Sequence, residues 1–205
     1  MYLYGASGHA KVVLDIIRDQ KIEIHGLFDD DSSVHALQGI PVIKTIDRLL
    51  EAPIIISVGD NKHRAKLASK LGKLQIEYGT VIHSSAVISK TATVGFGSVV
   101  TQGSIIQAEA VIGNHVIINT GASVDHDCLI KDFVSISPHA TLCGSVKVGE
   151  GTHICAGAVV IPNIVIGKWC VIAAGAVVIR DVPDYAVVAG IPGKIIKYSE
   201  FGPLM

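Results

Sequence analysis

VIGNHV IINTGA SVDHDC LIKDFV SISPHA TLCGSV, residues 111–146, divides into six-residue units without a remainder. The period continues on both sides: each of the seventeen residues reached in steps of six from Ile82 to Val178 is Ile, Leu or Val. Neither an α-helix nor an ordinary strand repeats every six residues. A parallel β-helix does, because each unit forms one short strand and a bend, and the stacked coils bury a continuous core. The sequence therefore predicts a parallel β-helix.

The repeat occupies only the second half of the 205-residue chain, which indicates two domains and a mixed fold class. We expect a small α/β domain in residues 1–78 and a β-helix domain with a C-terminal capping tail in residues 79–205. Seventeen Lys and Arg against eighteen Asp and Glu give no indication of nucleic acid as a partner. The N-terminus lacks a signal-peptide pattern, and no apolar run is long enough to span a bilayer. We expect a cytoplasmic protein without membrane insertion.

All four cysteines lie inside the repeat, at Cys128, Cys143, Cys155 and Cys170. Disulfides are rare in the cytoplasm, so we expect free thiols, with Cys128 and Cys170 as small core residues. No CxxC pair is present to suggest zinc, and the sequence predicts no metal site.

The N-terminal segment MYLYGASGHAKVVLDIIRDQ reads as a strand, a glycine turn and a helix. These make half of a Rossmann-like βαβ unit, and a second strand follows from Ile22 to Phe28 and ends in Asp29-Asp30-Asp31. A helix N-terminus attracts phosphate, and an acid after the second strand can reach a ribose hydroxyl. The sequence therefore predicts a nucleotide site, with these candidate residues: Gly5, Ser7, Gly8, His9, Asp29 and Asp30.

This motif is only G-x-x-G, so a tight turn that binds nothing is the alternative. Further along, residues 45–50 read as a short helix and Ile54 to Val58 as a buried strand. Gly59 follows in the next turn, and Asn61 can cap a helix that runs to Leu71. Both turns open at the carboxyl edge of one parallel sheet, where such sheets bind ligands. Gly59 and Asn61 therefore join the candidate site.

The segment Asn119 to Cys128, NTGASVDHDC, carries the most specific pattern. With GASGHAK near the N-terminus and the FDDD stretch, it makes the whole chain resemble the hexapeptide-repeat acyltransferases. Within these, the chain is most similar to the nucleotide-sugar N-acetyltransferases and sialic acid O-acetyltransferases of bacterial glycan pathways. The resemblance implies a left-handed β-helix with three hexads per coil, and a homotrimer that binds acetyl-CoA between subunits and needs no metal.

The resemblance further implies that the small domain binds a nucleotide sugar, with Asn119 among the binding residues, and that His126 and Asp127 form the catalytic pair. The expected reaction is acetyl transfer to an amine, at C4 of a nucleotide-linked amino-dideoxy sugar, and O-acetylation of a sialic acid is the alternative. Relatives of this kind often carry Glu after the His, where this chain has the shorter Asp127.

The chemistry of acetyl transfer fits these residues, because it needs a base for the nucleophile's proton and a donor for the developing oxyanion. His126 lies two residues after the inward Val124 and points outward, and Asp127 can fix its tautomer. Gly144 is eighteen residues on, one coil above, where a thioester carbonyl can approach its N–H. An outward His beside an Asp also arises by chance on a polar β-helix surface, which is the alternative.

A column of small residues and prolines, each eighteen positions apart, offers a smooth ledge for the pantetheine arm of CoA: Pro138, Ala156, Ala174 and Pro192. Arg180 and Lys194 lie near its end and can meet the CoA phosphates. The same column equally suits plain subunit packing.

The expectation of a trimer rests on apolar residues just before the anchors, too many for a solvated surface: Val99, Ile105, Val111, Ile117, Val159 and Val171. Three other functions are weaker. A β-helix carbonic anhydrase would need two histidines five residues apart, and none of the nine has that spacing. A dehydrogenase would need a larger dinucleotide fold than fits before the coils. A non-catalytic nucleotide-sugar-binding scaffold stays open.

Overall fold

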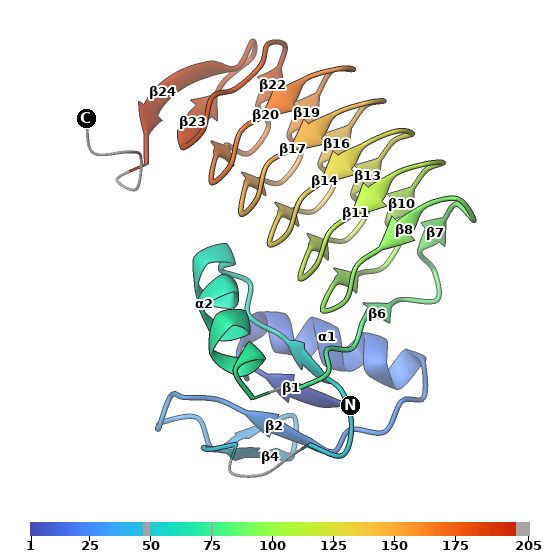
Figure 1. Ribbon diagram of the computed structural model, residues 1–205, viewed down its shortest axis with the longest axis vertical. Helices are drawn as coiled ribbons and strands as arrows, with labels where there is room; N and C mark the ends of the chain where they lie inside the picture. Colours follow the sequence, from blue (N-terminus) through green and yellow to red (C-terminus); the bar gives the residue numbers. More distant parts are fainter. Residues whose placement is uncertain (47–49, 75, 200–205) are drawn as a thin grey trace.

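The computed structural model describes residues 1–46, 50–74 and 76–199, and shows a small α/β domain packed beside one end of a long parallel β-helix (Figure 1). The sheet of the small domain has the order β3-β4-β2-β1-β5. Its strands are β1 (Tyr2–Tyr4), β2 (Gly26–Phe28), β3 (Ala36–Leu37), β4 (Ile40–Ile43) and β5 (Ile54–Ile56). All pair in parallel except β3, which is antiparallel to β4.

Helices α1 (Gly8–Asp19) and α2 (Asn61–Gly72) cover opposite faces of this sheet. Successive side chains of β1 point to opposite faces of the sheet. Leu3 packs with α1, whereas Tyr2 and Tyr4 pack on the face of α2. The carboxyl ends of β1 and β5 lead directly into the two helices. The turns at Gly5–His9 and Gly59–Asn61 therefore share one edge, as the sequence predicts.

The β-helix has three faces, each a parallel sheet of two-residue strands. Face 1 contains β6 (Val81–Ile82), β9 (Val99–Val100), β12 (Ile117–Ile118), β15 (Ser135–Ile136), β18 (His153–Ile154) and β21 (Val171–Ile172). Face 2 contains β7 (Val87–Ile88), β10 (Ile105–Ile106), β13 (Ser123–Val124), β16 (Thr141–Leu142), β19 (Val159–Val160) and β22 (Val177–Val178). Face 3 contains β8 (Thr93–Val94), β11 (Val111–Ile112), β14 (Leu129–Ile130), β17 (Lys147–Val148) and β20 (Val165–Ile166).

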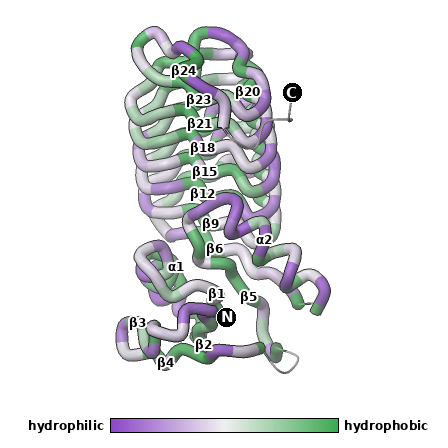
Figure 2. Tube along the Cα trace, turned by 90° about the vertical axis from the view of Figure 1, so that its left-hand side faces the viewer, coloured by the Kyte–Doolittle hydropathy of each residue, from purple (hydrophilic) through white to green (hydrophobic). Residues whose placement is uncertain are grey.

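The predicted register is confirmed, since Ile118 pairs with Ile136 and Val124 with Leu142, each eighteen residues apart. The anchors point inward and form one continuous apolar core along the axis. Figure 2 shows the strands of face 1 one above another, rising from the small domain. All four cysteines are free, and Cys128 and Cys170 are buried in the core.

The eighteen-residue step ends before the C-terminal tail. Strand β23 (Ala186–Ala189) pairs with β21 so that Val188 lies beside Ile172, only sixteen residues away. Pro192 therefore does not stack on Ala174, and the predicted column stops at Ala174. Strand β24 (Lys194–Tyr198) then pairs antiparallel with β23 and covers this end of the sheet.

Two predictions for the small domain are wrong in detail. Strand β2 begins at Gly26 and not at Ile22, because the Ile22 N–H donates to the Ile17 carbonyl and closes helix α1. Where the structure describes residues 45–50, at Thr45, Ile46 and Leu50, they are not helical, and 47–49 lie outside the described residues. Position 75, within the predicted small domain of residues 1–78, also lies outside them.

The small domain itself covers part of the apolar row that suggested a trimer. Val99 is 1% exposed and packs with α1, and Ile117 is 4% exposed. These two residues do not support a subunit interface, because their own chain buries them. Ile105 and Val111 remain exposed, at 36% and 45%, while Val159 and Val171 are half-buried. In the described part of the chain, neither helix has the length and apolar character needed to cross a bilayer.

Candidate functional site

His126 and Asp127 lie in the corner that joins β13 to β14, between faces 2 and 3. Asp127 has a φ of 59°, a conformation that Asp tolerates better than most residues, and this turns its carboxylate back toward His126. Asp127 Oδ2 lies 2.7 Å from His126 Nδ1. A carboxylate only accepts, so Nδ1 holds the proton and Nε2 keeps its lone pair in the neutral ring. Both side chains are more than half exposed, at 57% and 58%.

The pKa of His126 is raised above its ordinary value, first by the hydrogen bond from Nδ1 to Asp127 and then by the negative charge of Asp125. Asp125 also accepts the His126 backbone N–H at 2.8 Å, which fixes the corner. The pair is therefore held in one geometry, with Nε2 free to take a proton.

Gly144 lies directly against the His126 ring. A Cβ at this position would come within 2.6 Å of both Cε1 and Nε2 of His126. Glycine is therefore needed here to make room for the imidazole, and the ring leaves Gly144 buried. Within the described residues, the Gly144 N–H has no hydrogen-bond acceptor.

The other predicted cluster lines a cavity of about 350 Å³ between the small domain and face 1. The small domain contributes Gly8, His9 and Gly59, and the β-helix contributes Asn119 and residues of β12, β15 and β18. Four residues predicted for the nucleotide sugar thus meet in one cavity, although they come from three segments of the chain.

His9 is the most informative residue of this cavity. Its Nε2 is buried and has no hydrogen-bond partner in the described part of the structure. Burial lowers the pKa of His9 to about 4, with a further contribution from the charge of Arg64, so the ring is neutral at pH 7. A neutral ring nitrogen without a partner suits a polar ligand group in the cavity.

The remaining candidates of the small domain lie around the same edge. Gly5 has a φ of 108°, and a Cβ there would meet Val58 at 2.7 Å, so this glycine is needed for the turn. Gly8 has open space around it, and Ser7, the N-cap of α1, makes no side-chain cap bond. Asp29 accepts the backbone N–H groups of Ala6 and Asp31, at 2.7 and 2.8 Å.

Asp30 is exposed and accepts the Tyr4 hydroxyl at 2.7 Å, with Lys70 3.3 Å away. These partners, the hydrogen bond from Tyr4 first, lower the pKa of Asp30. The carboxylates of Asp29 and Asp30 therefore already form hydrogen bonds within the small domain, and Lys70 partly offsets the charge of Asp30.

Asn61 does not cap helix α2 as predicted. The cap is Asp60, which accepts the His63 N–H at 2.7 Å. Asn61 is buried, and its amide donates to the carbonyls of Gly151 and Thr152 in the β-helix. Asn61 therefore contacts the other domain.

The residues predicted for CoA lie on the surface: Ala156, Ala174, Arg180, Pro192 and Lys194 are exposed, and Pro138 is half-buried. Ala156 and Ala174 occupy the corner between faces 1 and 2, while Arg180 lies in the corner between faces 2 and 3, as His126 does. No group of three metal-ligating side chains gathers in the described ranges.

The cavity and His126 lie on different sides of the β-helix. A coil has three faces and three corners, and the cavity lies over face 1. His126 occupies the corner between faces 2 and 3, which is opposite face 1. One chain therefore does not bring the two predicted halves of the site together.

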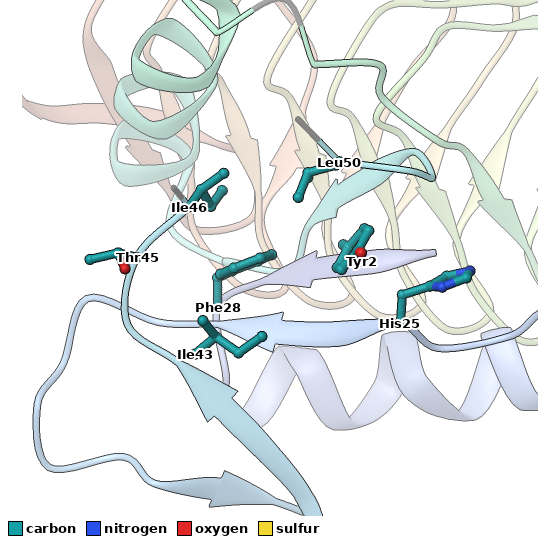
Figure 3. Close-up of a pocket in the computed structure, with 7 residues that line it drawn as sticks. All are labelled: Tyr2, His25, Phe28, Ile43, Thr45, Ile46 and Leu50. Carbon is teal, nitrogen blue, oxygen red and sulfur yellow. The ribbon is translucent and has the colours of Figure 1, made fainter. Parts of the chain in front are cut away.

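A separate cavity of about 270 Å³ lies on the α2 side of the small sheet (Figure 3). Tyr2, Phe28 and Ile43 line it from three neighbouring strands, away from helix α1. It contains none of the predicted site residues.

Sequence reasoning missed Arg64, Ser137 and His153. Ser137 and His153 line the cavity and share a hydrogen bond of 2.8 Å. Arg64 is completely buried between the domains. Its position was a usable signal, since Arg64 repeats with Leu67 and Leu71 on the buried side of α2.

Two family models match the chain: the PglD N-terminal domain over residues 1–71 and the bacterial transferase hexapeptide, six repeats, over residues 145–180. A UDP-N-acetylbacillosamine N-acetyltransferase from Bacillus subtilis is 42% identical over 101 residues, which are 45% of this chain and 47% of that protein. An uncharacterized mimivirus protein, L142, is 38% identical over 98 residues, which are 46% of this chain and 20% of that protein. The matches thus span less than half of these curated relatives.

Two solved structures are similar over nearly the whole chain. PerB from Caulobacter crescentus, in complex with CoA and GDP-perosamine, is 34% identical with a TM-score of 0.88, covering 96% of each chain. The acetyltransferase domain of PglB from Neisseria gonorrhoeae, in complex with acetyl coenzyme A, is 35% identical with a TM-score of 0.89, covering 95% of this chain and 98% of that one. This likeness confirms the fold class, a small α/β domain followed by a left-handed β-helix. The chain belongs to the hexapeptide-repeat sugar N-acetyltransferases, a family of acetyl-CoA-dependent acyltransferases.

Proposed function

We propose that this chain transfers the acetyl group of acetyl-CoA to the amine of a nucleotide-linked amino-dideoxy sugar, at C4, in the cytoplasm. Residues 1–78 bind the nucleotide sugar, and residues 79–205 carry out the transfer. The observation that carries the proposal is the His126–Asp127 pair, which leaves Nε2 of an exposed imidazole free as a base. Gly144 beside it has an N–H without an acceptor in the described structure.

In the proposed reaction, the neutral amine attacks the thioester carbonyl, and a C–N bond forms as the C–S bond breaks. His126 Nε2 takes the proton from the amine and passes it to the departing thiolate. Asp127 holds the tautomer and stabilises the imidazolium. The Gly144 N–H donates to the oxyanion, where a preorganised donor is worth most.

The nucleotide sugar occupies the cavity lined by Gly8, His9, Gly59 and Asn119. The free N–H groups at the start of α1 favour the diphosphate, and the neutral His9 offers Nε2. Gly5 shapes this turn, while Ser7, Asp29 and Asp30 lie at its rim. Acetyl-CoA runs along the corner with Ala156 and Ala174, and Arg180 and Lys194 meet its phosphates. No metal takes part.

The active site is shared between subunits of a homotrimer. The cavity of one chain and its own His126 lie on different sides of the β-helix, which supports a site that a neighbouring chain completes. Exposed Ile105 and Val111 supply apolar area for that contact. Sedimentation at micromolar concentration should give a trimer, and a monomer with full activity would contradict the shared site.

The test of the function is a thiol-release screen with acetyl-CoA against UDP-, GDP- and dTDP-linked amino sugars, with free and CMP-linked sialic acid as the acceptors of an O-acetyltransferase. We expect release only with an amino sugar, because one curated relative is a UDP-N-acetylbacillosamine N-acetyltransferase and the solved PerB structure contains GDP-perosamine. Release with sialic acid alone would replace the amine by a hydroxyl acceptor. Nucleotide-sugar binding without acetyl-CoA binding in titrations would favour the scaffold.

A further inference from the structure

Arg64 is a buried cation that forms no ion pair with a carboxylate in the part of the chain that the structure describes. Its side chain is 0% exposed, in the first turns of α2. Arginine is rarely fully buried, because leaving water is costly unless every N–H group finds an acceptor. The contacts of Arg64 show how that cost is offset.

The guanidinium of Arg64 joins two parts of the molecule. On the small-domain side, Nη1 donates to the carbonyls of Val58 and Gly59, each at 3.0 Å. On the β-helix side, Nε donates to the His115 carbonyl at 2.8 Å, and Nη2 donates to the Phe133 carbonyl at 2.9 Å. The five N–H groups of an arginine form a rigid fork, and only such a fork reaches all these acceptors at once.

Asn61 extends this contact by one coil. It accepts from Arg64 Nη2 at 3.0 Å and from the Ser135 hydroxyl at 2.6 Å, and donates to Gly151. His115, Phe133 and Gly151 are eighteen residues apart, so they occupy the same corner in three successive coils. We name Asn61, Arg64 and Ser135 the interdomain clasp.

The clasp lies behind the cavity proposed for the nucleotide sugar. Gly59 lines one wall of that cavity and Ser135 the other, and Arg64 bonds to both, at 3.0 and 3.2 Å. The positive charge of Arg64 acts on two histidines that line the cavity. After burial, it is the second cause that lowers the pKa of His9 and of His153. Arg64 therefore bonds to both walls and adds positive potential to the cavity, while it is not among the residues that line the cavity.

We propose that Arg64 is a positioning residue for the nucleotide sugar: its guanidinium fixes the Val58–Gly59 loop against the β-helix and so gives the cavity its width. This inference rests on the proposed function and adds a residue to it. A fixed wall favours binding of the nucleotide sugar in the ground state and the transition state alike. Its loss is therefore seen in KM for that substrate.

The test compares Arg64→Lys with Arg18→Lys in the full-length protein. Lysine keeps the charge but has three donors on a flexible stem and cannot span the fork. Arg18 is an exposed arginine of α1 that pairs with Asp15. It belongs neither to the interdomain clasp nor to the residues that line the cavity. For Arg64→Lys, loss of charged hydrogen bonds predicts that KM for the nucleotide sugar rises about 10- to 100-fold. KM for acetyl-CoA and the melting temperature of the coils should stay close to wild type, and R18K should match wild type throughout.

Asn61→Ala gives a second reading if R64K does not fold. It removes the bonds to Gly151 and Thr152 and one acceptor of Arg64, and Asn61 does not line the cavity. The same rise in KM for the nucleotide sugar, with a smaller factor, supports the clasp. Hydrogen exchange of residues 58–64 should be faster in both variants than in R18K.

Two results overturn the inference while the proposed function stands. In the first, R64K has the same KM for the nucleotide sugar as R18K. If R64K does not fold, the same comparison is made between N61A and R18K. The second result is a parallel loss of kcat and of affinity for both substrates, which would show a general effect on folding. Failure of the proposed function is distinguishable because it would be seen in the wild-type protein, which would then acetylate no nucleotide sugar. In that case the inference about Arg64 fails as well.

Discussion

Two consecutive corners of one coil have the same backbone and opposite surroundings. Asp127 and Phe133 occupy equivalent positions and have φ values of 59° and 60°. The corner at Asp127 is open, and its side chain holds the exposed His126. The corner at Phe133 faces the small domain, and its carbonyl accepts from the buried Arg64. The six-residue repeat therefore fixes the backbone of a corner, and whatever packs against the corner decides its role.

The largest effect should come from breaking the core that both corners share. Ile136→Asp places an unpaired carboxylate among fully buried aliphatic residues, which costs about 3–5 kcal/mol. We expect loss of the cooperative melting transition in circular dichroism and loss of soluble protein. Val87→Asp, at a strand position that is 63% exposed, should fold normally. Normal melting of I136D would show that the inward register is wrong.

Mutation of the open corner should leave the fold intact and lower the rate of acetyl transfer. His126→Ala removes the proposed base, which lowers kcat by about 10²- to 10⁴-fold. The melting temperature and the affinity for acetyl-CoA should be unchanged, because the side chain is exposed. His139→Ala, at another exposed corner, is the matched control. If H139A lost activity and H126A kept it, the base would be His139.

Gly144→Ala tests how closely the imidazole and the proposed oxyanion donor must be placed. The added Cβ would fall 2.6 Å from His126 Nε2, and the φ of Gly144 lies outside the left-handed region, so backbone strain does not contribute. Displacing the ring by about 1 Å should lower kcat by about 10²-fold with little change in melting temperature. Gly72→Ala, where a Cβ meets nothing within 4 Å, is the control. Wild-type kcat in G144A would mean that the ring position does not matter.

The smallest expected effect is a shift of the pH profile in Asp127→Asn. Asparagine tolerates the positive φ of this position but lacks the charge, so it no longer raises the pKa of His126. The base acts in its neutral form, so kcat/KM falls as the pH drops through the His126 pKa. The acid limb should therefore move to lower pH in D127N, with a smaller loss of kcat than in H126A. The limb should stay in place in Asp181→Asn, in the same type of corner further along the β-helix.

The N-terminal domain shows where local patterns were weaker than in the coils. The predicted helix α1 and the shared edge of the two turns are present. The predicted start of the second strand at Ile22 is wrong, because a hydrogen bond back to Ile17 closes the helix first. A short strand in an α/β sheet occurs once and depends on its neighbours for pairing, whereas the same six-residue pattern recurs in every hexad of the coils.

The sequence alone determined the β-helix, the inward anchors and the adjacency of His126 to Asp127, because these depend on spacing of six, eighteen and one residues along the chain. Only the tertiary structure decided which face the small domain covers, because docking depends on side chains from distant segments. The helical spacing of Arg64 with Leu67 and Leu71 indicates its burial, but its partners, the carbonyls of His115 and Phe133, are known only from the tertiary structure. For the same reason, only the structure revealed that Val99 and Ile117 are covered by their own chain and that the cavity lies on the side of the β-helix away from His126.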